Sequence, residues 1–166
     1  MFQIRKASLA DCVLIQQLAS QIWEPTYGDI LSPEQLDYMF HMMYDIQSIE
    51  EQQIEKGHVY FLIYKDSVPC AFLSIETVEA DLFIFQKVYS LPSVHGTGVG
   101  RYLIEQGVAY LKSIHPTPFA VELNVNRANP AIGFYEHLGF HKARTRDANI
   151  GNGYYMNDYV MRMEVK

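Results

Sequence analysis

The hydrophobic and polar positions of the first 30 residues predict one strand and one helix. FQIRKAS is typical of a strand, and Ser8 with Asp11 three residues later forms the capping box that opens a helix. Leu14, Leu18 and Ile22 fall on one helical face. The helix is therefore expected to extend to about Ile22 and to bury this stripe.

The following segment predicts a turn and two more helices. WEPTYGD contains Pro25 and Gly28, which mark a turn. Ser32 is placed to cap a second helix over about 33–44, whose first residue is a proline. A third, shorter helix is expected over about 49–56, because a glycine follows it.

From residue 58 the pattern changes from that of helices to that of strands. HVYFLIYKD, VPCAFLSIETV and LFIFQKVYS are rich in β-branched and aromatic residues, and short polar turns at 66–67 and 79–81 separate them. This arrangement predicts an antiparallel meander of three strands.

The remainder of the chain alternates between helices and strands. A helix with one apolar face is expected over about 99–114, and FAVELNV follows as a strand. Asn129 is expected to cap a short helix, with Pro130 at its first position and Gly139 just past its end. FHKARTR and YYMNDYVMRMEV complete a pair of strands across a turn at 149–153.

The order of these elements predicts a single domain, residues 1–166, of the mixed α+β class. One crossover helix joins the fourth and fifth strands, so one parallel pair is expected in a twisted, mostly antiparallel sheet. About seven strands and four or five helices are expected.

Composition and charge exclude several classes of partner. The chain is 49% hydrophobic and 19% charged, which is typical of a globular protein, and its formal net charge is −6. An acidic surface disfavours nucleic acid and anionic membranes, and it favours a cationic or neutral small substrate. No stretch resembles a signal peptide or a membrane span, so a cytoplasmic location is expected.

Metal and disulfide chemistry are not expected. Cys12 and Cys70 form no CxxC motif and are interpreted as reduced, buried thiols. His137 and His141 are four residues apart, but Gly139 ends the helix between them, so they do not share a metal-binding face.

The stretch VHGTGVGRYL carries the strongest chemical signal. Gly96, Gly98 and Gly100 stand between a strand and a helix, where backbone N–H groups and the helix dipole can hold a phosphate. GxxxxGK[ST] is absent, and the dinucleotide motif GxGxxG fails because Arg101 occupies its sixth position. The remaining interpretation is a loop that binds a pyrophosphate after the fourth strand of a mixed sheet.

Two motifs resemble the GNAT superfamily of N-acetyltransferases over essentially the whole chain. HGTGVG at 95–100, followed by Arg101, is similar to its signature Arg/Gln-x-x-Gly-x-Gly/Ala, with His95 in place of Arg or Gln. NPAIGFYEHLGF at 129–140 is similar to its second motif, and residues 88–92 look like its fourth strand. The order and spacing of the two motifs carry the resemblance.

The resemblance implies acetyl-CoA as cosubstrate and strands four and five that splay apart. Its pyrophosphate would lie on the amides of 95–101, and its pantetheine arm would bond the backbone near Val88 and Ser90. The amide near Tyr89 would serve the oxyanion, and Tyr135 would hydrogen-bond or protonate the leaving thiolate. The cofactor-binding residues implied are Val88, Tyr89, Ser90, His95, Gly96, Thr97, Gly98, Val99, Gly100, Arg101 and Asn129.

The general base remains open among four carboxylates. Glu76, Glu79, Glu122 and Asp158 lie on or near strands, and a solvated strand face is the alternative for each. The period of FAVELNV places Glu122 on the face opposite its large apolar residues. Direct attack by the amine in a ternary complex is expected, because neither cysteine has a neighbouring histidine.

The acceptor is expected to be a primary amine. Aromatic and acidic residues between the first two strands would suit a cation, or they pack helices and face water: Trp23, Glu24, Tyr27, Asp29, Asp37 and Tyr38. IWEPTYGDILSPEQLDYM looks loosely similar to bacterial spermidine/spermine acetyltransferases. Two rival functions are a non-catalytic acyl-CoA-binding module and acetylation of a protein N-terminus or lysine. A homodimer is a further expectation from the resemblance.

Overall fold

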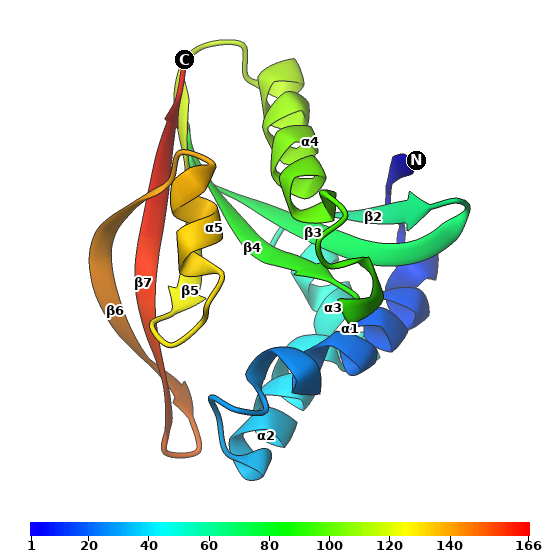
Figure 1. The fold of residues 1–166 in the computed structure, drawn as a ribbon, viewed down its shortest axis with the longest axis vertical. Coiled ribbons are helices and arrows are strands. Elements are labelled where there is room, and N and C mark those ends of the chain that lie inside the picture. The colour runs from blue at the N-terminus through cyan, green and yellow to red at the C-terminus, as the bar shows by residue number, and fades with distance from the viewer.

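A computed structural model describes residues 1–166, and its centre is one seven-stranded sheet (Figure 1). The strand order is β1-β2-β3-β4-β5-β7-β6, and only β4 and β5 run parallel. The strands are β1 (Phe2–Lys6), β2 (Val59–Lys65), β3 (Val68–Glu79), β4 (Leu82–Ser90), β5 (Phe119–Asn126), β6 (His141–Gly151) and β7 (Tyr154–Val165). The predicted α+β class with one parallel pair is confirmed.

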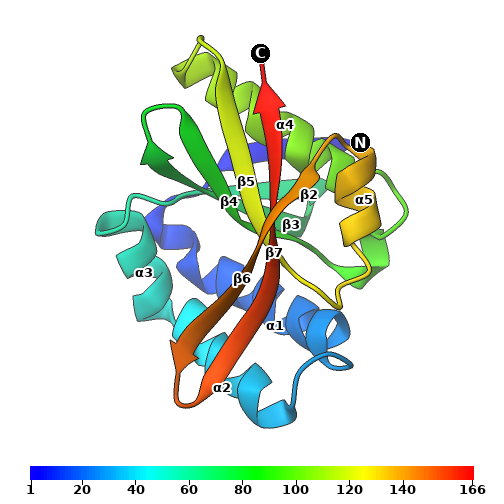
Figure 2. The ribbon, with the colours of Figure 1, turned by 90° about the vertical axis from the view of Figure 1, so that its left-hand side faces the viewer.

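Helices cover both faces of the sheet (Figures 1 and 2). They are α1 (Cys12–Tyr27), α2 (Pro33–Tyr44), α3 (Ile46–Ile54), α4 (Val99–Ile114) and α5 (Ile132–His137). The first three lie on one face, whereas α4 packs on the other. None of the five combines the length and the apolar character needed to cross a bilayer.

The parallel pair opens after three residues. Leu82–Ile84 pairs with Ala120–Glu122, after which β4 remains bonded only to β3 and β5 only to β7. Figure 1 shows the two strands diverging below this point. The second half of β4 therefore has a free edge.

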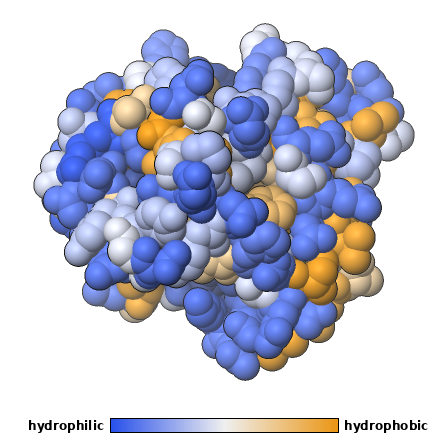
Figure 3. All heavy atoms as spheres, turned by 90° about the horizontal axis from the view of Figure 1, so that it is seen from below, coloured by the Kyte–Doolittle hydropathy of each residue, from blue (hydrophilic) through white to orange (hydrophobic).

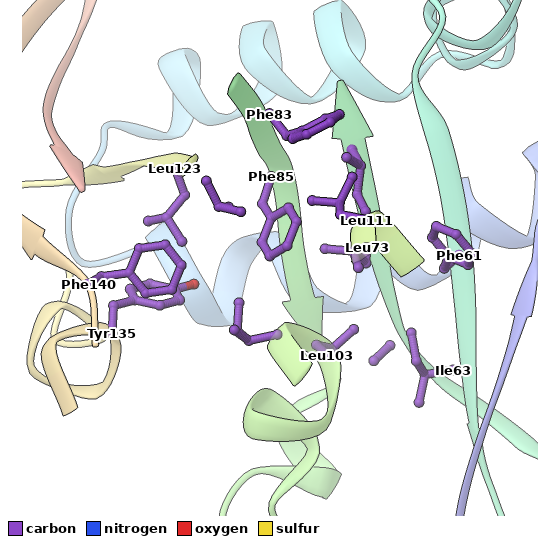
Figure 4. Packing of buried hydrophobic residues seen from close by; sticks show 14 of the residues in the cluster. Phe61, Ile63, Leu73, Phe83, Phe85, Leu103, Leu111, Leu123, Tyr135 and Phe140 are labelled. Carbon is purple, nitrogen blue, oxygen red and sulfur yellow. The ribbon is translucent and has the colours of Figure 1, made fainter. Parts of the chain in front are cut away.

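A bulge reverses the direction in which β4 presents its side chains. Ser74 pairs with Lys87 but Ile75 pairs with Phe85, so Gln86 is the extra residue. Before the bulge, Phe85 packs in the cluster beneath α4 (Figure 4). After it, Lys87 and Tyr89 face α2 and α1, as their contacts with Tyr44 and Tyr27 of those helices show.

Two hydrophobic clusters lie on opposite faces of the sheet. The cluster under α4 includes Phe85, Leu103 and Leu123 (Figure 4). Gly107 allows α4 to approach closely, because a Cβ there would come within 2.7 Å of Cζ of Phe85. The second cluster, around Trp23, packs α1, α2 and α3 against β2 and β3.

Helix α1 is one turn longer than the sequence predicts. The turn expected at Pro25 is wrong, since the helix continues to Tyr27. A proline inside a helix costs about 3 kcal/mol. Here Trp23 before the proline and Tyr27 after it are both buried, and their packing against each other offsets that cost.

The short helix also begins later than expected. Asn129 does not cap it, because Ala131 is the N-cap and the helix starts at Ile132. The Asn129 carboxamide instead accepts from the Ala131 amide at 2.9 Å, which closes a local turn before the helix. Asn129 thus satisfies the amide of Ala131, the residue at which the helix begins, instead of capping the helix itself.

The last two strands form a hairpin that reaches α2 (Figure 2). The first of its strands extends into the turn predicted over 149–153, so that only Asn152 and Gly153 separate the two strands. Tyr38 donates to the carbonyl of Ile150 at 2.7 Å. Gly151 has φ of 91°, and a Cβ there would lie 2.6 Å from the Tyr38 hydroxyl, so this contact requires glycine.

Candidate active site

A cavity of about 750 Å³ occupies the opening between β4 and β5. This size is in the range of small-molecule sites. Its walls come from the end of α1, the open edge of β4, the glycine loop, β5 and α5. The sequence-predicted residues that line it are Val88, Tyr89, Ser90, His95, Gly96, Gly98, Val99, Gly100, Arg101, Asn129 and Tyr135. Thr97 does not line it.

The glycine loop directs a set of free amides toward this cavity. Gly96 and Gly98 have φ of 79° and 89°, conformations that favour glycine, and a Cβ at either would meet nothing within 4 Å. No carbonyl accepts from their amides. The amides of residues 99–101 are likewise free, because they form the first turn of α4.

Two amides of the loop are already used. His95 donates to the carbonyl of Pro92 at 3.1 Å, and Thr97 donates to that of Val94 at 3.3 Å. The Thr97 hydroxyl also bonds the Val94 carbonyl. The anion cradle predicted over 95–101 therefore reduces to the amides of Gly96 and 98–101.

The ring of His95 turns back toward β4. Its Nε2 lies 3.2 Å from the carbonyl oxygen of Ser90, so that nitrogen is the donor. The imidazole thus braces the loop against the end of the strand. The His95 ring therefore adds to the backbone donors of the loop and does not replace them.

Phe134 also lines the cavity, although the sequence did not identify it as a candidate site residue. It is 38% exposed and lies so near Gly100 that a Cβ there would come within 2.7 Å of its Cζ. Glycine at 100 is needed for this approach of α5 to the loop. The motif at 129–140 contains this phenylalanine, but its position in a short helix does not show that the ring lies beside the glycine loop.

The open edge of β4 offers alternate peptide groups. Leu91 donates to the carbonyl of Cys70 on β3 at 2.9 Å. Because peptide groups alternate along a strand, Tyr89 also faces β3, whereas Val88 and Ser90 face the opening. The strand amides open to the cavity are therefore those of Val88 and Ser90, not that of Tyr89.

Tyr135 reaches the cavity from α5. Its ring packs against Phe140 at 5.9 Å between centroids, and its hydroxyl points into the cluster (Figure 4). Burial raises the pKa of this phenol well above its ordinary value of 10.0, and Tyr27 raises it further. Tyr135 therefore keeps its proton across the neutral range and acts as a hydrogen-bond donor.

The end of α1 contributes a second phenol. The hydroxyls of Tyr27 and Tyr89 lie 2.8 Å apart. Burial raises the pKa of Tyr27 to about 12, although the bond to Tyr89 lowers it, and the charge of Asp158 adds to the rise. Tyr27 lines the cavity, whereas Trp23 is held in the core by a bond from Nε1 to the carbonyl of Leu36 at 3.0 Å.

The acidic residues expected near the acceptor face solvent. Glu24, Asp29 and Asp37 are all exposed, so the solvated reading holds for them. Figure 3, seen from below, shows hydrophilic residues dominating that surface, with apolar atoms in scattered groups. No aspartate or glutamate lines the cavity itself.

The four candidate bases have different surroundings. Glu122 is 2% exposed and accepts from Arg144 at 2.9 Å and Arg162 at 3.0 Å. The bond from Arg144, followed by that from Arg162, holds the pKa of this carboxyl below its ordinary value. Glu76 accepts from a glutamine at 2.7 Å, and Glu79 is exposed at the end of β3.

Thiol and metal chemistry have no evident site. Cys12 and Cys70 are both buried and unpaired, and burial raises the pKa of each thiol. No three histidine, cysteine, aspartate or glutamate side chains gather as metal ligands. Neither cysteine lines the cavity.

A sheet opened between two parallel strands, with free helix-start amides beside the opening, defines the acetyltransferase class of fold. The chain belongs to the GNAT family: the acetyltransferase (GNAT) domain model matches residues 56–142. The family resemblance carried by the two sequence motifs is thus confirmed.

Solved structures share this fold over nearly the full length. The PaiA N-acetyltransferase of Thermoplasma acidophilum, solved with coenzyme A, matches with a TM-score of 0.80 at 19% identity, covering 99% of each chain. The ribosomal-protein-S18-alanine N-acetyltransferase of Escherichia coli matches with 0.73 at 19%, covering 99% of this chain and 94% of that one. The spermidine/spermine N-acetyltransferase SpeG of Vibrio cholerae matches with 0.69 at 18%, covering 98% and 93%.

Proposed function

We propose that this protein transfers the acetyl group of acetyl-CoA to a primary amine by direct attack in a ternary complex. One observation carries the proposal: the free amides of Gly96 and 98–101, the open edge of β4 and the Tyr135 hydroxyl meet at a single cavity. Each is a group that this reaction needs, and they come from four separate elements.

The residues present fit coenzyme A. A pyrophosphate requires several convergent donors without Cβ atoms in the way, and the loop offers five such amides around open space at Gly96 and Gly98. A pantetheine arm carries amides that can bond an unpaired strand edge, such as that of Val88 and Ser90. The coenzyme A complex of the structurally similar PaiA enzyme supports the same occupant.

The reaction then balances as follows. The protonated amine first loses one proton, its nitrogen then forms a bond to the acetyl carbon, and the bond from that carbon to sulfur breaks. The products are an acetamide, the free thiol and the one released proton. An open β4 amide, that of Val88 or Ser90, stabilises the negative oxygen. Tyr135 donates a hydrogen bond to the departing sulfur, and the second amine proton ends on it.

Small cationic amines, polyamines among them, are the proposed acceptors. The net charge of −6 favours a cationic substrate, and the end of α1 presents Tyr27 to the cavity. The likeness to the spermidine/spermine enzyme supports this class. The likeness to the S18-alanine enzyme keeps a protein N-terminus as the second candidate.

The test is thiol release from acetyl-CoA with polyamines, amino acids, aminoglycosides and short peptides. Release with a polyamine supports the proposal, and release with peptides alone supports the second candidate. Tyr135→Phe should lower turnover about 100-fold, because general-acid assistance is worth that much or more, and leave coenzyme A affinity unchanged. Coenzyme A binding without release for any acceptor would instead identify a non-catalytic binding module.

A further inference from the structure

One buried carboxylate has no partner. Asp158 of β7 is 4% exposed, and no hydrogen bond or ion pair joins its carboxylate to another residue, although its oxygens are not fully enclosed and remain accessible. It stands opposite Asn126 of β5 and Arg146 of β6 in the sheet register. Buried carboxylates without compensation are costly, so a residue of this kind requires an explanation.

Glu122 offers the direct comparison on the same face of the sheet. Glu122 and Asn126 lie four positions apart on β5, so their side chains project to the same side of the sheet. Asp158 pairs with Asn126 and therefore projects to that side as well. Glu122 is equally buried but holds two arginines, which satisfy its charge within the protein. Asp158 has no such pair, and its bonding capacity remains available to a ligand.

The charges that act on Asp158 come from three elements. Arg146 and Asp147 of β6 and Arg127 of the loop after β5 influence its carboxyl, and its own charge influences Tyr27 of α1. Arg127 is itself bonded to Asp147 at 2.5 Å. Burial raises the pKa of the Asp158 carboxyl, more than the two arginines lower it.

This carboxylate also lies on the acceptor side of the opening. Tyr27, which feels its charge, lines the cavity from α1, opposite the glycine loop that receives the anion. Asn124 of β5 lines the cavity and projects to the same face as Asn126, which pairs with Asp158. Asp158 does not itself line the cavity, so an acceptor amine would reach this carboxylate past Asn124, along the β5–β7 pair.

We propose that Asp158 binds the ammonium group of the acceptor and takes its proton before attack. The inference rests on the proposed function and names the missing base. The proton moves from nitrogen to a carboxylate oxygen, the freed lone pair attacks the acetyl carbon, and Asp158 returns the proton to water when the product leaves. A cationic acceptor supplies the partner that Asp158 lacks within the protein.

Asp158→Asn tests the inference, with Glu122→Gln as the matched control. The asparagine keeps the shape and removes no partner, so the variant should fold with an unchanged melting temperature. Its kcat/KM for a polyamine at pH 7 should fall at least about 100-fold, while its coenzyme A affinity stays within twofold. Glu122→Gln should lower the melting temperature and leave the pH dependence of kcat/KM as in the wild type.

Acceptors of different basicity provide a second readout. An amine that is already neutral at pH 7, such as a hydroxylamine, needs no base, so Asp158→Asn should slow it less than about tenfold. Equal losses for neutral and protonated amines, or no loss for either, would overturn the inference while leaving acetyl transfer intact. If the wild type released no thiol with any amine, the proposed function would fall. Calorimetric titration of the coenzyme A complex with spermidine would then test the inference separately. If spermidine binds and Asp158→Asn does not weaken that binding, the inference is overturned.

Discussion

The two faces of the sheet bury different kinds of side chain. Under α4 lies a cluster of 21 buried residues in which Tyr135 is the only one with a hydroxyl. On the face of α1, α2 and α3 lie all six buried polar or charged residues: Gln52, Ser74, Lys87, Glu122, Asn126 and Asp158. The face under α4, on the side of the proposed cofactor, therefore buries almost no polar groups and is called the dry face; the opposite face, on the side of the proposed acceptor, holds the buried charged residues and is called the acceptor face.

A row of polar groups crosses the acceptor face. Tyr60, Ser74 and Lys87 stand side by side on β2, β3 and β4. Lys87 donates to Oε1 of Gln52 at 2.9 Å, and the Tyr60 hydroxyl donates to the same atom. Three buried polar atoms in this region have no partner, namely Tyr44 Oη, His58 Nδ1 and Ser74 Oγ. The difference between the faces teaches that one is packed almost wholly by apolar side chains, whereas the other also buries polar and charged ones.

The largest effect should come from damage to the dry face. Phe85→Ala removes a ring that is 2% exposed at the centre of the α4 cluster. It should lower the free energy of unfolding by about 3–5 kcal/mol, equally at pH 6 and pH 9. Urea unfolding at both pH values measures this. A pH-dependent loss would mean that titratable groups also support this face.

The second-largest effect should come from the glycine loop at 96–100, which lies beside the dry face. Gly98→Val strains a backbone with φ of 89° and projects a side chain beside the free amides. Coenzyme A affinity by calorimetry should fall about 100-fold, as expected when an anion loses its backbone donors. Gly57→Val is the control, because its φ of 68° carries similar strain far from the cavity. If both variants bind coenzyme A normally, the loop is not the anion site.

A smaller effect, of opposite sign, is expected on the polar face. Burial lowers the pKa of Lys87 from 10.5 to about 7, so unfolding takes up a proton between those pH values. The cost of burying the charge is full below pH 7 and is relieved as the pH rises toward 10.5. Lys87→Met should stabilise the protein by about 1–3 kcal/mol at pH 7, and the gain should shrink by pH 9.

Lys112→Met is the control for that change. Lys112 is exposed on α4, so its removal should leave stability and its pH dependence unchanged. Urea unfolding from pH 6 to pH 9 compares the three proteins. A Lys87→Met protein that is less stable than the wild type at every pH would show that the ammonium is stabilising where it lies.

The smallest effect should come from the tyrosine pair beside the cavity, at the end of α1. Tyr27→Phe removes one hydroxyl of the bond to Tyr89 and leaves the other without its partner. It should cost about 1 kcal/mol of stability. Thermal unfolding measures this against Tyr155→Phe, whose ring is 51% exposed. Equal melting temperatures would mean that water replaces the lost bond.

Much of the cofactor side could be predicted from sequence, because its signals are local. Glycines before a helix and the motif around Tyr135 carry their meaning within a few residues. The period of β5 likewise placed Glu122 on the correct face. It could not indicate that Arg144 and Arg162 would satisfy that carboxylate, since both come from other strands.

The acceptor side was less predictable for two physical reasons. Pro25 is a turn signal that tertiary packing overrode, which hid the approach of Tyr27 to the cavity. Alternation along β4 fails at Gln86, so Lys87 could not be assigned to the face that buries it. Asp158 was one of four equal candidates because isolation of a charge is visible only in three dimensions.

The single extra residue in β4 has an evolutionary consequence. Gln86 is the one residue of the strand that β3 does not pair at this point, and the residues that follow it border the cavity. A one-codon deletion of Gln86 would leave Phe85 beneath α4 and Lys87 on the opposite face, because the two would then alternate regularly. A one-codon deletion after the bulge would instead exchange the two faces for every later residue of the strand, so this stretch of β4 should tolerate the loss of Gln86 better than the loss of its neighbours.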